Sequence, residues 1–158
     1  MKPTKIWSLA SYALAAAIFA FVLAQILVSR GFSVPVSPIN LPITIAAIGL
    51  TLAALAIPMI RYRKALKDPK KRAKRLSPTY AFRVLILAKS SALAASLFFG
   101  WHAGILVAQL SLPAITSNIS FTIIGLIASL FTTAVALVVE NTFKIPPDPE
   151  EPAEGSPA

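Results

Sequence analysis

Residues 6–29 read IWSLASYALAAAIFAFVLAQILVS, and this run contains no charged side chain. As an α-helix it would be about 36 Å long, enough to cross the roughly 30 Å hydrocarbon core of a bilayer. Lys2 and Lys5 precede the run and residues 22–24 resemble a cleavage site, so a secretory signal peptide is the competing interpretation. The run is longer than a typical signal-peptide core. We therefore expect a retained transmembrane helix.

Three further apolar runs follow, at about 41–60, 80–110 and 119–140. Hydrophobic residues make up 56% of the 158 residues and charged residues only 13%, too few to cover a soluble domain with a polar surface. The sequence predicts an all-α membrane protein whose four transmembrane helices form one domain, residues 1–145. An acidic, proline-rich tail at 146–158 lacks the apolar residues needed to fold alone.

The positive charge gathers in the predicted loop at 61–79. This segment carries nine basic residues against one acid, Asp68: Arg61, Arg63, Lys64, Lys67, Lys70, Lys71, Arg72, Lys74 and Arg75. Short basic loops stay in the cytoplasm, so we expect both termini there and only Arg30 on the outer side. The loop is expected to bind anionic lipid headgroups. Nucleic acid is not an expected partner, because Tyr62 is the only aromatic residue among these bases.

An internal repeat relates two of the runs. Residues 11–28 read SYALAAAIFAFVLAQILV and residues 90–107 read SSALAASLFFGWHAGILV, which are identical at ten of eighteen positions. This pattern suggests a duplicated helical hairpin, residues 1–60 and 80–140, with both copies in the same orientation. Alanine-rich helices also align by chance, and that alternative stays open.

Small residues recur at every fourth position of the third run: Ala88, Ala92, Ser96, Gly100, Gly104 and Ala108. Membrane helices associate where small residues let their backbones approach closely. We expect this stripe to be a packing seam within the bundle. The alternative is that Gly100 and Gly104, which form a GxxxG motif, join two copies of the chain.

The polar residues inside the runs are the candidates for chemistry. Lys89 and Glu140 are expected near the cytoplasmic side, where they either form a structural ion pair or line a polar site with Arg83 as an anion contact. His102 is predicted to form an interhelical hydrogen bond, with Gln109 on the same face two turns on. Trp101 is expected either to anchor at the outer interface or to pack in the bundle.

The sequence contains no cysteine and no catalytic, nucleotide-binding or metal-binding motif. We therefore expect no catalytic residue, no cofactor and no metal site, and the chain is not predicted to be an enzyme.

The third run also carries a family resemblance. Arg83-Val84, Ala88-Lys89, Ser91-Ala92 and the segment GWHAG at 100–104 resemble the actinobacterial membrane family called domain of unknown function 3180. The resemblance implies a four-helix protein of the bacterial plasma membrane with no assigned activity, often encoded beside folate-biosynthesis genes. It directs attention to six residues: Arg83, Lys89, Gly100, Trp101, Gly104 and Glu140.

Two functions fit these observations. In the first, the protein is a non-enzymatic accessory or scaffold subunit that binds a membrane protein, a cytosolic protein or a second copy through helix packing and its basic loop. In the second, it is a small-solute transporter, or the membrane subunit of one, that uses Lys89 and Glu140.

Overall fold

The computed structural model describes residues 4–66, 77–111 and 119–143. Within this part the chain forms four α-helices: α1 (Ile6–Ser29), α2 (Asn40–Leu66), α3 (Pro78–Ser111) and α4 (Ile119–Phe143). Each helix is long and apolar enough to cross a membrane. The predicted all-α architecture with four such helices is confirmed.

The ends of the helices follow from local sequence. After α1, Gly31 adopts a φ of 82°, and the N–H groups of Gly31 and Phe32 donate to the carbonyls of Val28 and Leu27. This is a Schellman cap, which favours glycine at the left-handed position. Pro78 begins α3, where its missing N–H costs no helical hydrogen bond.

The boundary between α2 and the basic loop differs from the prediction. Residues 61–66 were assigned to the loop at 61–79, but they continue α2 to Leu66. Arg63 and Lys64 lie in the last turn, where cations are favourable beside unpaired helix carbonyls. Pro58 consequently lies inside the helix rather than in its last turn. Residues 67–76 of the loop and the tail at 146–158 lie outside the described residues.

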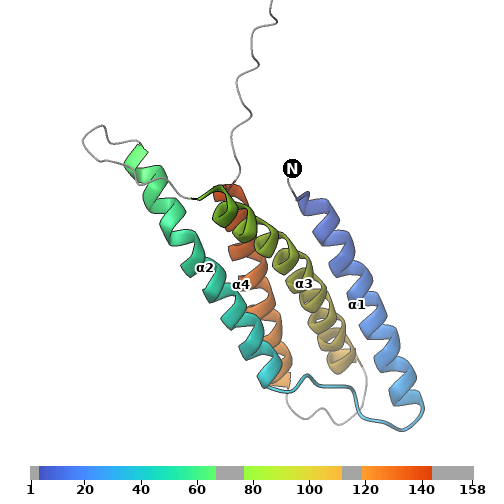
Figure 1. The fold of residues 1–158 in the computed structure, drawn as a ribbon. Helices are drawn as coiled ribbons and strands as arrows, with labels where there is room; N and C mark the ends of the chain where they lie inside the picture. Colours follow the sequence, from blue (N-terminus) through green and yellow to red (C-terminus); the bar gives the residue numbers. More distant parts are fainter. Residues whose placement is uncertain (1–3, 67–76, 112–118, 144–158) are drawn as a thin grey trace, which may run out of the picture.

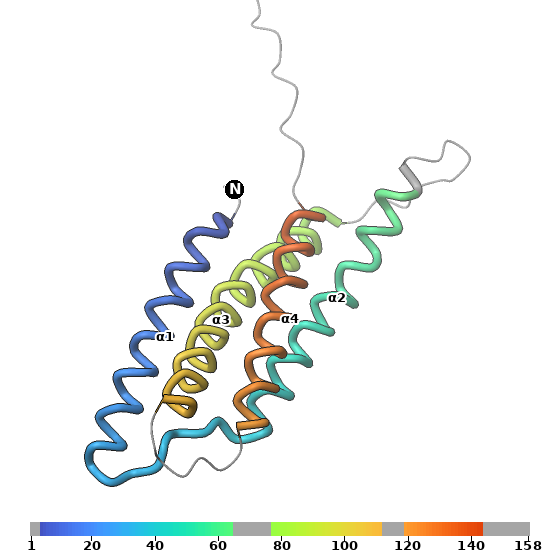
Figure 2. Tube along the Cα trace, turned by 180° about the vertical axis from the view of Figure 1, so that it is seen from behind, coloured from blue at the N-terminus to red at the C-terminus, as the bar shows by residue number. Residues whose placement is uncertain are grey.

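The helices lie in the spatial order α1, α3, α4, α2, with α3 and α4 in the middle (Figures 1 and 2). Among the described residues, no Cα atom of α1 comes within 8 Å of α2 or α4. The start of α1 and the end of α4 lie at the same end of the bundle, here called the N-terminal end. The linker from α1 to α2 crosses the opposite, distal end (Figure 1).

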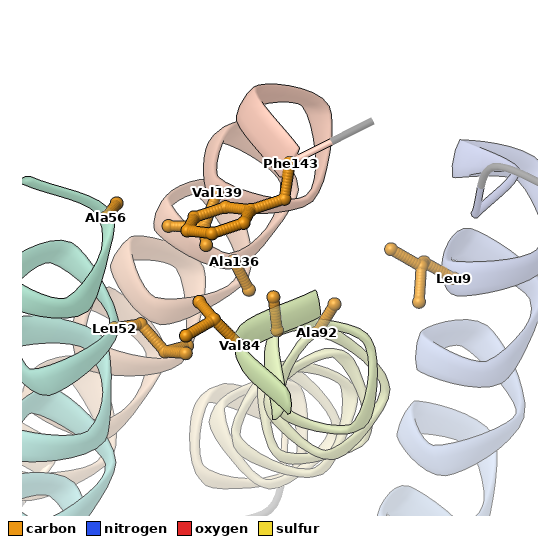
Figure 3. Packing of buried hydrophobic residues seen from close by; sticks show 9 residues of the cluster. Leu9, Leu52, Ala56, Val84, Ala92, Ala136, Val139 and Phe143 are labelled. Carbon is orange, nitrogen blue, oxygen red and sulfur yellow. The ribbon is translucent and has the colours of Figure 1, made fainter. Parts of the chain in front are cut away.

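Two clusters of buried apolar residues hold the bundle together. Figure 3 shows the larger one at the N-terminal end, where Val84, Ala92 and Phe143 meet Leu52 of α2 and Leu9 of α1. The smaller cluster joins α1, the linker and α3 through Ala20, Val34 and Ile105. Alanine is frequent in both clusters, so close packing of backbones contributes much of the contact.

Helices α1 and α3 approach each other closely at two glycines of α3. A Cβ atom placed on Gly100 would overlap the backbone carbonyl of Ala13, and one on Gly104 would overlap that of Ala17. Ala92 and Ser96 are also buried on α3. The GxxxG face is therefore covered by α1 of the same chain.

The two halves of the chain pack differently. Helices α3 and α4 are neighbours, whereas α1 and α2 are separated within the described structure. The hairpin of α1 and α2 is therefore packed differently from the hairpin of α3 and α4.

Candidate polar site at the N-terminal end

Lys89 of α3 and Glu140 of α4 face each other across the interface of the two central helices. The Nζ atom of Lys89 lies 3.7 Å from Oε1 of Glu140. The Glu140 side chain is only 3% exposed, whereas that of Lys89 is 26% exposed. Lys89 is thus partly exposed beside a buried carboxylate.

The N-terminal segment completes this site. The backbone N–H of Thr4, just before α1, donates a 2.7 Å hydrogen bond to the same Oε1 atom. Glu140 therefore joins three parts of the fold: the start of α1, the middle of α3 through Lys89, and the end of α4. In the described structure this bond is a direct polar contact between the segment that precedes α1 and helix α4.

The second carboxylate oxygen has a different environment. Oε2 of Glu140 is buried and has no hydrogen-bond partner in the described structure. A buried acceptor without a donor costs about 1–3 kcal/mol, and more when it is charged. The Lys89 contact is too long to count as a hydrogen bond, so among the described residues the carboxylate is stabilised by charge attraction to Lys89 and by the Thr4 donor.

Arg83 does not join this pair. It is exposed on α3, and six residues separate it from Lys89. Six residues correspond to about 9 Å along a helix and roughly 240° around it, so the two side chains leave α3 in different directions. The sequence-based expectation of a shared anion contact therefore has no support in the geometry.

His102 is buried against α4, but it bonds differently from the prediction. Its Nδ1 atom lies 2.7 Å from the carbonyl oxygen of Phe98, one turn earlier in α3. A carbonyl can only accept, so Nδ1 carries the proton and donates it. The predicted interhelical hydrogen bond is wrong, because the partner surface on α4 is Gly125, which offers no side chain.

Further buried polar atoms lie along α3 and α4. Nε2 of His102, both amide atoms of Gln109 and the hydroxyl oxygen of Thr122 have no hydrogen-bond partner within the described ranges. Thr122 lies one turn from Gly125 on α4, and no sequence pattern marks it. A threonine carries no signal in an apolar run, since its hydroxyl usually bonds to its own helix.

Trp101 packs in the bundle. It is half-buried, and its ring centre lies 6.4 Å from that of Phe19 on α1 at an angle of 40°. Ten residues separate it from the end of α3 at Ser111, which places it about 15 Å inside that end. This depth favours packing over anchoring at the interface.

These features define a multi-pass membrane protein with several polar residues buried between its helices. Residues 9–147 match the family model described as "Protein of unknown function (DUF3180)", and the chain belongs to that family. The resemblance to domain of unknown function 3180 is thereby confirmed, while its actinobacterial origin stays a prediction. No curated protein and no solved structure matches the chain.

Proposed function

We propose that the protein is a non-enzymatic accessory or scaffold subunit of a membrane complex. The observation that carries this proposal is the engagement of Glu140 with Lys89 and the N–H of Thr4. The buried carboxylate of Glu140 thus holds α4 to α3 and to the segment before α1. A residue in this role supports a stable framework for association rather than chemistry.

The proposal includes a location and an orientation. We place the protein in the bacterial plasma membrane with both termini in the cytoplasm. In support, Arg61, Arg63 and Lys64 are exposed at the end of α2, the same end at which α1 starts and α4 finishes. A basic segment on that side agrees with the positive-inside rule. Together with the remaining bases up to Arg75, these residues would bind anionic lipid headgroups.

The test is the composition of the complex in its native membrane. Mild extraction followed by mass measurement should yield a stoichiometric membrane or cytosolic protein partner. A chain recovered only as a monomer or a homodimer, across several mild detergents, would contradict the accessory role.

One observation favours transport of a small solute as a second candidate. Oε2 of Glu140 is buried without a donor, and Lys89 is partly exposed beside it. A solute with a donor group could complete this site. In the structural role, Lys89→Glu and Glu140→Lys each destabilise the protein, and the double swap restores stability. In the transport role, Glu140→Gln leaves the protein folded and abolishes solute flux.

A further inference from the structure

A hollow opens on the side of the bundle where α1 and α2 do not meet. Its volume is about 570 Å³, and α1, the linker, the start of α2 and α3 contribute its walls, among them Phe19, Pro35, Leu41, Ala94 and Trp101. A second hollow of about 210 Å³ between α2, α3 and α4 shares Ala94 and Phe98 with the first. The two hollows share this part of the α3 wall, and the larger hollow is called the groove below.

The chemistry of this groove is that of a hydrocarbon chain. Ser37 is the one hydroxyl-bearing residue among the residues that line the larger hollow, and the others are aliphatic, aromatic or proline. The volume falls within the range of small-molecule pockets, about 300–1,000 Å³. Leu97 and Phe98 in its α3 wall are exposed, so a lipid chain can reach the groove from the side of the bundle.

Charge at the distal end adds a second, independent feature. Arg30 is the only residue with a charged side chain between positions 6 and 60, and positions 90–139 contain no Asp, Glu, Lys or Arg. It is exposed at the start of the linker that continues into the wall of the hollow. A lone arginine at headgroup level is complementary to an anionic lipid.

The linker also offers donors. The N–H groups of Gly31 and Phe32 are used in the cap of α1, but those of Val36 and Ser37 donate to no backbone carbonyl in the described part of the chain. Both residues line the hollow. Backbone N–H groups are common ligands of phosphate oxygens, and they need an acceptor where water is scarce.

We propose that this groove is a binding site for a phospholipid with an anionic headgroup. One acyl chain lies along α3 over Ala94 and Phe98, and the phosphate contacts Arg30 and the linker N–H groups. The site is separate from Lys89 and Glu140 and does not depend on the accessory role proposed above.

The test uses the full chain in mild detergent, supplied with equal amounts of phosphatidylglycerol and phosphatidylcholine. Retained lipids are counted by mass spectrometry of the intact protein. The wild type should retain phosphatidylglycerol preferentially. Arg30→Gln should lower the ratio of retained phosphatidylglycerol to phosphatidylcholine about fivefold, the effect of one basic residue at a membrane surface. Arg30→Lys should keep the ratio within about twofold, because the charge remains.

A second variant tests the acyl chain. Ala94→Phe places a ring in the groove and should reduce retention of both lipids, whereas Ala15→Phe, on an exposed alanine of α1 that does not line the larger hollow, should retain them. Should Ala94→Phe fail to fold, Arg30→Gln still decides the matter, because Arg30 is exposed.

Three results would overturn the proposal. The first is an unchanged lipid ratio in Arg30→Gln, and the second is equal retention by folded Ala94→Phe and Ala15→Phe. The third uses a photoreactive residue in place of Leu97, which lines the hollow. The photoreactive residue should label phospholipid. Labelling of another protein or of a second copy of the chain would instead show that a helix of that partner occupies the groove.

Discussion

Replacing Gly100 by alanine tests the seam between α1 and α3 directly. The new Cβ atom would lie 2.7 Å from the carbonyl carbon of Ala13 and closer still to its oxygen, whereas ordinary contact begins at 3.4 Å. The obstacle is backbone, which cannot rotate away as a side chain can. Helix α1 must therefore move outward by about 0.7 Å or more, which weakens dispersion contacts along the whole seam.

The magnitude follows from two opposing effects. Overfilling a tight contact costs about 1–3 kcal/mol, and a backbone obstacle belongs at the upper end of that range. Alanine regains about 1 kcal/mol of helix propensity relative to glycine. We expect Gly100→Ala to lower the free energy of unfolding by about 2 kcal/mol. Adding Gly104→Ala should cost less than a second full increment, since α1 has already moved.

The assay is reversible unfolding in mixed micelles at increasing dodecyl sulfate, followed by circular dichroism. Gly49→Ala is the matched control: its nearest neighbours are side-chain atoms of Thr132 and Phe131, at 2.7 and 3.0 Å, and side chains can adjust. It should cost less than Gly100→Ala. Equal stability of Gly100→Ala and the wild type would refute the close approach of α1 to α3.

Three further substitutions address the polar residues of the bundle. Gly125→Ala should destabilise the protein by about 1–3 kcal/mol, because the new Cβ atom overlaps the His102 ring. Adding His102→Ala to the same chain should recover part of that loss when the single and double variants are unfolded in parallel. Thr132→Val should cost about 1 kcal/mol because its hydroxyl bonds to a carbonyl of α2, whereas Thr142→Val, whose hydroxyl bonds within α4, should cost less in the same titration. Gln109→Leu should leave stability unchanged or raise it, since the amide has no partner in the described structure, and a clear loss would show that the amide is hydrogen-bonded.

Much of the fold could be predicted from composition and periodicity. Apolar runs such as residues 6–29 define helices because only a helix satisfies its own backbone within a bilayer. The small residues of the third run likewise predicted a close contact. They could not predict that α1 would be the partner, because stripes of small residues occur on several helices and pair with one another by shape.

The polar residues were harder to place, for a physical reason. For Lys89 and Glu140 two alternatives were open, a structural ion pair or a polar site with Arg83, since an intramembrane charge is compatible with either. The bond from Thr4 to Glu140 involves a backbone group, which every residue possesses and no sequence pattern marks. His102 bonds within its own helix, and Gly125, which has no side chain, lies opposite it. Which residue of α4 lies opposite depends on how the two helices are aligned along their length, and a sequence pattern does not show this alignment.

The contact between α1 and α3 joins segments that are made far apart in time during synthesis. Ala17 and its partner Gly104 are 87 residues apart in the chain (104 − 17). At about 5–20 residues per second, the ribosome needs roughly 4–17 s to make the partner after Ala17. Helix α1 must therefore wait in the bilayer without its neighbour, and α2, which packs against α4 and α3, likewise arrives before its partners. A membrane insertase that shelters the first helix during this interval would raise the yield of folded protein, and faster elongation would shorten the wait.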